Sequence, residues 1–483
     1  MPLLVSFWNT TTLCANPAGR PDARAGTARW RSAFADPDDR ECGGGRSEAA
    51  GRRRPAPGRT AARVRQLVIA QWARSFNGRE PVLSRGAVRW EPTHVRVLCA
   101  TTANDGHFGP LSPFARALAD AGHEVRVAAP ASYARAVVKA GFTHEPFADG
   151  PRELIGAVMG RLPTLAFEEA DDLVVREVFG RIDAQAALPS LLETVERWHP
   201  DLVLRESAEL ASLAAAERAG VPHVHVSIGM HEILTRFAAA ITDPLEELGR
   251  LAGLAEGRVS FALASETVLS VVPEMLDHGG EPAPPESAHF LRFHVPASAS
   301  NAPRLPDWGD PAAPLIYVTF GSVTGSLPSF AGVFRQALDA LADVDARVLM
   351  TVGRKVDPDE LGPLPSNAHV KQWWPQDAVL RQAAAMLGHG GFGTTMGALG
   401  AGVPQVVVPL FTSDQVVNGD HVAAVGAGIT VERGPASVQL AAAEVPRLLT
   451  DPTYVDSARR VAAAIADLPS TAEAVHTLAG LID

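Results

Sequence analysis

The sequence predicts an α/β protein of two domains that face a cleft, each built on a parallel sheet with helices on both faces. Near-continuous apolar runs such as residues 95–101 are typical of strands buried on both faces. Helical patterns that stop at a glycine separate these runs, as in a chain that alternates strand and helix. A proline-rich stretch divides the pattern into two sets, and 483 residues are enough chain for two or three cores.

Residues 1–92 differ in composition from everything that follows. They contain 16 arginines and no lysine, are rich in glycine, proline and alanine, and show little periodicity. Such a segment buries too little apolar area to offset its ordering entropy, so we expect a disordered extension. A tail of this charge could bind nucleic acid or an anionic membrane. We favour a translation start placed too far upstream, because basic tails are usually denser in charge and contain lysine.

The N-terminal domain is predicted over residues 93–296 and begins with a repeated strand–helix unit. The strand at 95–101 leads into a glycine-containing turn at 105–110, and then into a helical pattern that ends at Gly122. The remaining predicted elements are a strand at 125–129, a strand at 201–204, a helix to 219 and a strand at 223–227. Most of residues 150–300 is more irregular, with polar insertions, and is where we expect the acceptor to bind.

A linker at 297–314 precedes a C-terminal domain at 315–465 and a helix at 466–483, which could pack back on the N-terminal domain. The expected strands of this domain are 315–320, 347–352, 368–371, 385–388, 405–408 and 428–431. The expected helices are 329–342, a short one after Pro375, 394–401 and 413–425, and the tail from residue 456 is also helical. Each domain is thus a Rossmann-like, doubly wound sheet, and ligands bind such sheets at the carboxyl ends of the strands.

Charge and composition exclude several classes of protein. A net charge of −11 argues against nucleic acid as the main partner, since phosphate binding needs a basic surface. The cysteines Cys14, Cys42 and Cys99 have no metal-ligand spacing and suggest no disulfide framework. No run of 18 apolar residues is present, so no membrane span is predicted. We therefore expect a cytoplasmic protein, while its oligomeric state is left open.

The strongest chemical signal is the turn His389–Thr395, which follows a predicted strand and opens a helix. Glycines such as Gly391 and Gly393 let backbone N–H groups approach an anion, and the helix N-terminus adds partial positive charge. Thr394 can donate its hydroxyl to a phosphate oxygen. The pattern predicts a diphosphate site; the alternative is a tight strand–helix turn without a ligand.

Two flanking segments, 372–376 and 409–415, complete a larger motif with this turn. The motif resembles the donor-binding signature of glycosyltransferase family 1, and within it the actinobacterial natural-product enzymes of the macrolide, enediyne and polyketide group. The resemblance covers the chain from about His94 onward and implies the two-domain GT-B fold. It implies stacking of Trp373 on the nucleobase, with either Trp373 or Trp374 serving as core instead, and a hydrogen bond from Gln376 to the base.

The same resemblance assigns further donor contacts. His389 and Thr394 would hold the diphosphate, Ser322 would contact its phosphate side, and Asp414 with Gln415 would reach the sugar hydroxyls. The family's plant members carry a ribose-binding glutamate where this chain has Gly397. This departure is compatible with a deoxythymidine diphosphate sugar, although Gly397 could equally be a helix-packing residue.

His107 lies in a turn that resembles the family's His-x-x-Pro catalytic motif. The resemblance implies that His107 deprotonates the acceptor hydroxyl, and an imidazole with a free pKa near 6.5 suits that task. Glu206 stands where the family has an orienting aspartate, at the end of the segment 200–206. Asp105 is the alternative base, and a turn histidine near solvent is the alternative reading of His107.

Three other features are weaker. Asp343 and Asp345 have a metal-binding spacing but sit in a predicted turn with no second metal cluster, so we expect no metal. The acidic run 168–172 is expected to be a solvated helix start, and His421 a surface histidine of a helix.

The resemblance to this family, together with the residues above, thus implies an inverting, metal-independent hexosyl- or glycosyltransferase, with dTDP- or UDP-sugar as co-substrate, no other cofactor, and a small hydroxylated acceptor of secondary metabolism. One alternative is an inactive nucleotide-sugar-binding helper, against which His107 and Glu206 count. The other is an epimerase on the same fold, in which the His107 turn would have no role.

Overall fold

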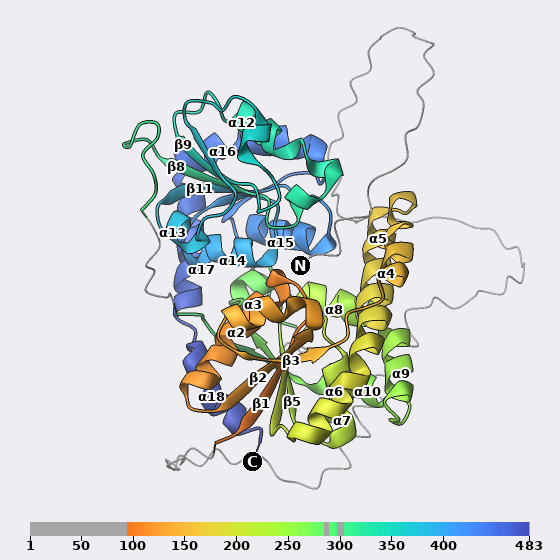
Figure 1. Ribbon diagram of the computed structural model, residues 1–483. Coiled ribbons are helices and arrows are strands. Elements are labelled where there is room, and N and C mark those ends of the chain that lie inside the picture. The colour runs from red at the N-terminus through yellow and green to blue at the C-terminus, as the bar shows by residue number, and fades with distance from the viewer. Residues whose placement is uncertain (1–93, 285–288, 297–303, 483) are drawn as a thin grey trace, which may run out of the picture. The chain divides into compact units, whose positions relative to one another are not determined.

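A computed structural model describes residues 94–284, 289–296 and 304–482 (Figure 1). The predicted extension at 1–92 lies outside these residues, as does the stretch 297–303 of the predicted linker. The strands described form two sheets, and every pairing within each sheet is parallel. The predicted fold class, two parallel-sheet α/β domains, is confirmed.

The first sheet has seven strands in the order β3-β2-β1-β4-β5-β6-β7. Their bounds are β1 Arg96–Ala100, β2 Glu124–Pro130, β3 Thr143–Phe147, β4 Leu202–Glu206, β5 His223–Val226, β6 Thr267–Ser270 and β7 Phe290–Arg292. The order runs outward from β1 in two directions, with β2 on one side and β4 on the other. The carboxyl ends of β1 and β4 are therefore neighbours at the point where a doubly wound sheet binds its ligands.

The helices of this half are more numerous than predicted. They are α2 Asp105–Asp120, α3 Ala134–Lys139, α4 Arg152–Met159, α5 Phe167–Leu173, α6 Ala184–Trp198, α7 Ala211–Ala219, α8 His231–Ala240, α9 Thr242–Leu251, α10 Arg258–Ser265 and α11 Glu274–Asp277, with a π-helical segment at Val174–Asp183. The expectation of an irregular region at 150–300 was therefore wrong. Most of these helices are short, and the π-helical segment does not follow the 3.6-residue period that reveals a helix in sequence.

The predicted turn at 105–110 is also corrected, because helix α2 begins at Asp105. Asn104 caps it by accepting a hydrogen bond from the backbone N–H of Gly106 at 2.8 Å. Glycine and proline in this stretch resemble turn formers, but the cap satisfies the first free N–H groups and lets the helix start early. His107 is thus held on a helix rather than on a loop.

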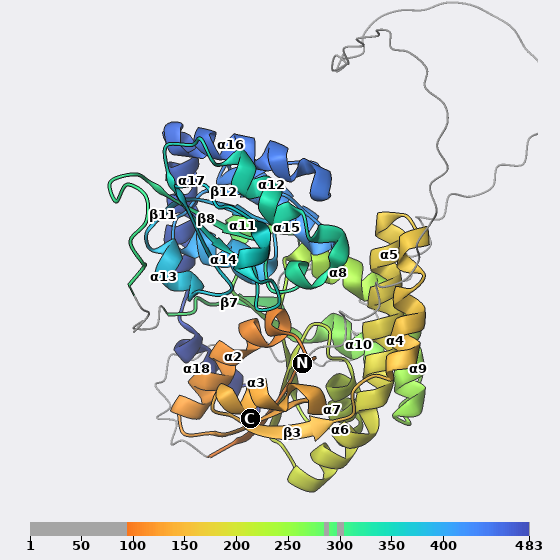
Figure 2. The same ribbon diagram turned by 45° about the horizontal axis from the view of Figure 1, so that its top comes forward.

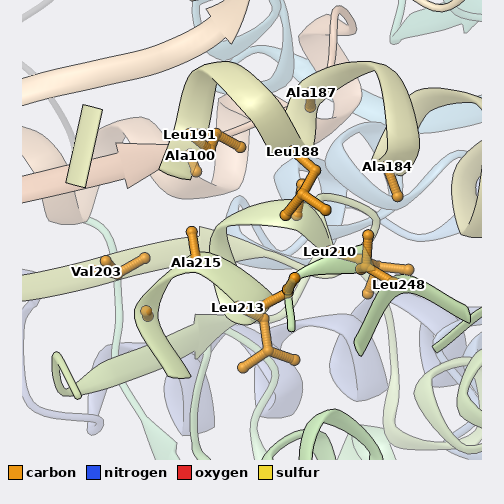
Figure 3. Packing of buried hydrophobic residues seen from close by; sticks show 14 of the residues in the cluster. Ala100, Ala184, Ala187, Leu188, Leu191, Val203, Leu210, Leu213, Ala215 and Leu248 are labelled. Carbon is orange, nitrogen blue, oxygen red and sulfur yellow. The ribbon is translucent and has the colours of Figure 1, made fainter. Parts of the chain in front are cut away.

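Both faces of the first sheet are covered, which explains the continuous apolar run of β1. Leu98 and Ala100 point to one face and pack with α6 and α7, where Leu191 and Leu213 are buried (Figure 3). Val97 and Cys99 point to the other face, against α2. Successive side chains of a strand alternate between faces, so two helix layers demand apolar residues at every position.

The second sheet has six strands in the order β10-β9-β8-β11-β12-β13. Its strands are β8 Leu315–Thr319, β9 Arg347–Thr351, β10 Ala368–Lys371, β11 Ala383–Gly388, β12 Gln405–Val407 and β13 Gly428–Thr430. Its helices are α12 Val333–Ala340, α13 Gln376–Leu380, α14 Phe392–Gly400, α15 Ser413–Ala424, α16 Val438–Thr450 and α17 Pro452–Ala466. Every strand predicted here is present to within two residues.

The last helix, α18 Thr471–Ala479, packs on the first sheet's domain rather than on the second. It lies beside α2 in both ribbon views (Figures 1 and 2). Ala474, Val475 and Leu478 are buried in the same cluster as Val97. The C-terminal segment therefore completes the core of the N-terminal domain. Within the described part of the chain, none of the helices combines the length and the apolar character of a membrane span.

Candidate active site

His107 and Glu206 meet at the carboxyl ends of β1 and β4. The imidazole Nδ1 lies 3.1 Å from Oε2 of Glu206 and 2.9 Å from the hydroxyl oxygen of Thr102. Because Nδ1 faces a carboxylate, the neutral imidazole carries its proton there and keeps a lone pair on Nε2. The side chain of His107 is 15% exposed and that of Glu206 is fully buried.

Backbone amides hold Glu206 as an anion. Its Oε1 accepts from the N–H of Thr102 at 3.0 Å, and its Oε2 accepts from the N–H of Ala208 at 2.7 Å. Burial alone would raise the pKa of this carboxyl, but the charge and hydrogen bond of His107 and the two amides outweigh burial and lower it. The buried charge is therefore compensated, and the lengthened side chain still reaches the imidazole.

The carboxylate acts on His107 in the opposite sense. Burial alone would lower the pKa of the imidazole, but the charge and hydrogen bond of Glu206, together with the charges of Asp414 and Asp183, raise it above its usual value. A base with a raised pKa binds the transferred proton more strongly. This pair has the geometry of a general base and its orienting partner.

Asp105, the alternative base, is occupied elsewhere. It is exposed, and its Oδ1 accepts a hydrogen bond from the Tyr133 hydroxyl at 2.5 Å. No hydrogen bond joins it to Glu206 among the described residues. It therefore lacks the orienting partner that His107 has.

In the C-terminal domain, His389 is held between two glycines. A Cβ added to Gly321, whose φ is +76°, would come within 2.8 Å of the ring, and one added to Gly391 within 2.6 Å. The side chain is buried, its Nδ1 has no hydrogen-bond partner among the described residues, and burial lowers its pKa to about 4. A neutral, partly unsatisfied imidazole beside the N-terminus of α14 suits an anionic ligand.

The turn that precedes α14 is built around Gly390. Its φ is +85°, and an added Cβ would lie 2.6 Å from the backbone oxygen of Gln415. The carbonyl of Gly390 accepts a hydrogen bond of 2.7 Å from the fully buried Asn418 on α15. Only glycine satisfies both the left-handed conformation and this close approach.

Thr394 and Gln376 lie together at the mouth of α14. The Thr394 hydroxyl donates to Oε1 of Gln376 across 3.5 Å. A Cβ added to Gly397 would lie 2.7 Å from Nε2 of the same glutamine. Gly397 therefore makes room for the amide of Gln376, so the packing role considered for this glycine is present.

The two adjacent tryptophans have different environments. Trp373 is 57% exposed, and the Arg354 guanidinium lies 5.4 Å from the centroid of its ring. The two side chains help to line a surface hollow of about 610 Å³, with Asp357, Lys371 and Gln372. Trp374 packs against the core around Leu349 and Leu380. One tryptophan is thus available for stacking and the other is core.

The two residues predicted to contact the sugar, Asp414 and Gln415, have different environments in the first turn of α15. Gln415 is buried, and its Oε1 accepts from the backbone N–H groups of Leu410 and Phe411 at 2.8 and 3.1 Å. The side-chain amide oxygen of Gln415 therefore holds the turn at Leu410 and Phe411, which precedes α15. Asp414 is partly exposed, and burial with the nearby charge of Asp171 raises its pKa. Ser322 is exposed and directly follows Gly321, the glycine that lies against the His389 ring.

Two expectations about polar residues outside the site need correction. Helix α5 carries the acidic run, but Asp171 within it is not simply solvated, because it accepts a hydrogen bond from the Ser413 hydroxyl. His421 is not a free surface histidine: Nδ1 is 2.8 Å from the carbonyl of Leu276, and Nε2 is 3.4 Å from Glu232. Helices α8 and α11 pack against α15. They partly bury His421, which α15 alone would leave exposed.

Asp343 and Asp345 lie in the connection between α12 and β9. Across residues 94–284, 289–296 and 304–482, no three His, Cys, Asp or Glu side chains are grouped so that they could share a metal ion.

Comparison with known proteins gives the family. Two domain profiles named for erythromycin biosynthesis protein CIII-like proteins match this chain, the N-terminal one at residues 116–278 and the C-terminal one at 335–481. An L-demethylnoviosyl transferase of Streptomyces niveus is 32% identical over 80% of this chain and 98% of its own length. This chain belongs to the erythromycin biosynthesis protein CIII-like family of glycosyltransferases.

Solved glycosyltransferases share the fold along nearly their whole length. SnogD of Streptomyces nogalater is 28% identical with a TM-score of 0.63, covering 81% of this chain and all of its own. VinC, solved in complex with dTDP, is 25% identical with a TM-score of 0.63, covering 80% of this chain and 99% of its own. The family and the enzyme class predicted from the sequence are confirmed.

Sequence reasoning missed several residues that shape this glycosyltransferase's site. Thr102 shares Nδ1 of His107 with Glu206, and Asn418 fixes the turn before α14. The ring centroid of Phe179 lies 5.6 Å from that of His107, and the charge of Asp183 acts on the same imidazole. No motif marks these four residues, because each reaches the site through a tertiary contact.

Proposed function

We propose that this glycosyltransferase transfers a sugar, with inversion at the anomeric carbon and without a metal ion, from a nucleotide-diphosphate sugar to a hydroxyl of a small secondary metabolite. The observation that carries the proposal is the His107–Glu206 pair, a histidine with its Nδ1 on a buried carboxylate. A sugar-binding helper without catalysis would need no such pair. Relatives such as an L-demethylnoviosyl transferase and an aklavinone 7-β-L-rhodosaminyltransferase support the transfer of a sugar to a secondary metabolite.

In the proposed reaction, Nε2 of His107 takes the proton of the acceptor hydroxyl. The acceptor oxygen then forms a bond to the anomeric carbon from the side opposite the diphosphate, whose bond to that carbon breaks, and the nucleoside diphosphate leaves. Glu206 stays ionised and stabilises the imidazolium that forms. General base catalysis of this kind is worth ~10²–10⁴ in rate.

The departing diphosphate gains negative charge, which the C-terminal domain is arranged to stabilise. The first N–H groups of α14 point at the turn that contains Gly391, and the helix dipole adds partial positive charge there. His389 and Thr394 supply further hydrogen-bond donors. Such fixed donors can do the work of a metal ion, so we expect turnover to survive chelation by EDTA.

For the donor we favour a dTDP sugar over a UDP sugar. The amide of Gln376 fills the space beside Gly397, where the family's plant members carry the carboxylate that binds ribose hydroxyls. A deoxyribose has one hydroxyl fewer to satisfy. The dTDP bound in VinC supports this preference.

The test is a transfer assay with dTDP-α-D-glucose as donor and the coumarin umbelliferone as acceptor. We expect a β-glucoside, formed equally well in EDTA, and a fall of ~10²–10⁴ in turnover for His107→Ala. The dTDP-induced rise of the melting midpoint should be the same in this variant as in wild type. An α-glucoside would contradict inversion, and undiminished turnover in His107→Ala would exclude this base.

A further inference from the structure

We propose that Phe179 and Asp183, on the π-helical segment Val174–Asp183, select the acceptor as an aromatic compound with a second hydroxyl beside the reactive one. Phe179 would contact the aromatic ring of the acceptor, and Asp183 would accept a hydrogen bond from the second hydroxyl. This inference rests on the proposed role of His107 as the base.

Phe179 is packed against the base itself. The two ring centroids are 5.6 Å apart with the ring planes tilted by 35°, and both side chains are only partly buried. The phenyl ring therefore lies beside the imidazole, and an acceptor bound at Nε2 would meet it. Aromatic rings pair in tilted or offset arrangements at such distances, so a planar aromatic acceptor is favoured over a small polar one.

Asp183 is a partly buried carboxylate without a partner. It makes no hydrogen bond or ion pair with the described residues, and at the start of α6 its side chain does not cap the helix. The backbone confines it, because a Cβ added to Gly150 would lie 2.4 Å from its Oδ1. Partial burial removes some of the water around this carboxylate, and no protein donor replaces it. A ligand hydroxyl would supply that donor.

Its position on the π-helical segment, four residues after Phe179, brings Asp183 near the base, and the charges around it agree. Burial and the negative charge of Asp149 raise the pKa of Asp183 to about 6, while His107 acts in the opposite direction. Phe179 and Asp183 are four residues apart on one helical segment and so lie near the same face. The phenyl ring of Phe179 and the carboxylate of Asp183 can therefore contact the same substrate molecule.

A neutral hydroxyl fits this position better than a cationic group. His107 becomes positively charged as it takes the acceptor's proton, and a second cation held at Asp183 would oppose that step. A hydroxyl donates to the carboxylate without adding charge.

The test compares two coumarins with dTDP-α-D-glucose as donor: umbelliferone, with one hydroxyl, and esculetin, with two adjacent hydroxyls. We expect wild type to favour esculetin in kcat/KM, and Asp183→Asn to reduce this preference by roughly fivefold to tenfold. The matched control is Asp172→Asn, the same change at an exposed position, which should keep the preference. Phe179→Leu should lower kcat/KM for both coumarins by roughly threefold to tenfold.

One donor-side measurement separates this inference from the proposed function. Asp183→Asn should leave unchanged the dTDP-induced rise of the melting midpoint. A wild type without preference for esculetin, or an Asp183→Asn variant that keeps it, overturns the inference alone. A wild type that binds dTDP but glucosylates neither coumarin overturns it and leaves the donor assignment standing.

Discussion

At the scale of single residues, the site depends on the hydrogen bonds that the buried carboxylate of Glu206 accepts. Two backbone amides and one imidazole contact the same fully buried carboxylate, so its charge is fixed while its effect is directed at His107. Both residues could be predicted, because each belongs to a local motif. Thr102, Phe179 and Asp183 could not, since their relation to His107 exists only once β1, β4 and the π-helical segment are folded together.

This arrangement predicts the pH dependence of transfer. The base works only when neutral, and Glu206 holds the pKa of His107 above its usual value, so kcat/KM falls as the pH drops below that raised pKa. In Glu206→Gln the carboxylate no longer offsets burial, and the pKa of His107 falls. We expect the acid limb of the kcat/KM profile to move to lower pH by on the order of one unit, with a lower plateau.

The comparison variant is Asp105→Asn, which removes the alternative base. Its acid limb should coincide with that of wild type, because Asp105 bonds Tyr133 and not Glu206. An acid limb that moves in Asp105→Asn and stays in place in Glu206→Gln would contradict His107 as the base and would favour Asp105 instead.

At the scale of elements, the turn before α14 is the most constrained part of the donor site. An anion-binding turn could be predicted here from the sequence, because glycines between a strand and a helix allow a left-handed backbone conformation and let an anion approach the backbone closely. What the sequence did not show is the anchor: Asn418, from the next helix, holds the carbonyl of Gly390. Likewise, Asn104 starts α2 at Asp105 where glycine and proline suggested a turn.

Gly390→Ala should damage this turn. The added Cβ would meet the Gln415 carbonyl oxygen at 2.6 Å in a conformation with φ of +85°, a strain of about 1–3 kcal/mol. We expect a lower free energy of unfolding and weaker dTDP binding by calorimetry. Gly400→Ala, at the C-terminal end of the same helix where an added Cβ meets nothing within 4 Å, should lower neither the free energy of unfolding nor the affinity for dTDP. Equal behaviour of the two variants would contradict the constraint.

At the scale of the whole molecule, two parallel sheets follow from the alternation of apolar strands and helices, and the sequence was sufficient to predict them. Apart from the helix start expected at 168–172, the helices between β3 and β4 and between β5 and β6 were not predicted, because short helices with narrow apolar faces give weak periodicity. The sequence left open whether a C-terminal helix packs back on the N-terminal domain, because that depends on tertiary packing: the small apolar face of α18 fits against α2, far away in the chain.

This placement predicts that a C-terminal substitution destabilises the N-terminal domain. Leu478 is 1% exposed in the cluster around Val97, and Leu478→Ala should cost about 2–5 kcal/mol of unfolding free energy. Leu481→Ala, at a position 40% exposed, should cost less than about 1 kcal/mol. Denaturant unfolding followed by circular dichroism measures both, and comparable losses would contradict the packing of α18.

The donor site itself is tested most directly by the melting midpoint of wild type and His389→Ala with and without dTDP, each variant compared with its own ligand-free state. At 100 times its dissociation constant, dTDP should stabilise wild type by about 2.7 kcal/mol, and the midpoint should rise by several degrees. The His389→Ala variant should lose most of that rise, because the neutral imidazole between Gly321 and Gly391 no longer meets the diphosphate. An equal rise in both proteins, or no rise in wild type, would contradict the placement of the diphosphate at the N-terminus of α14.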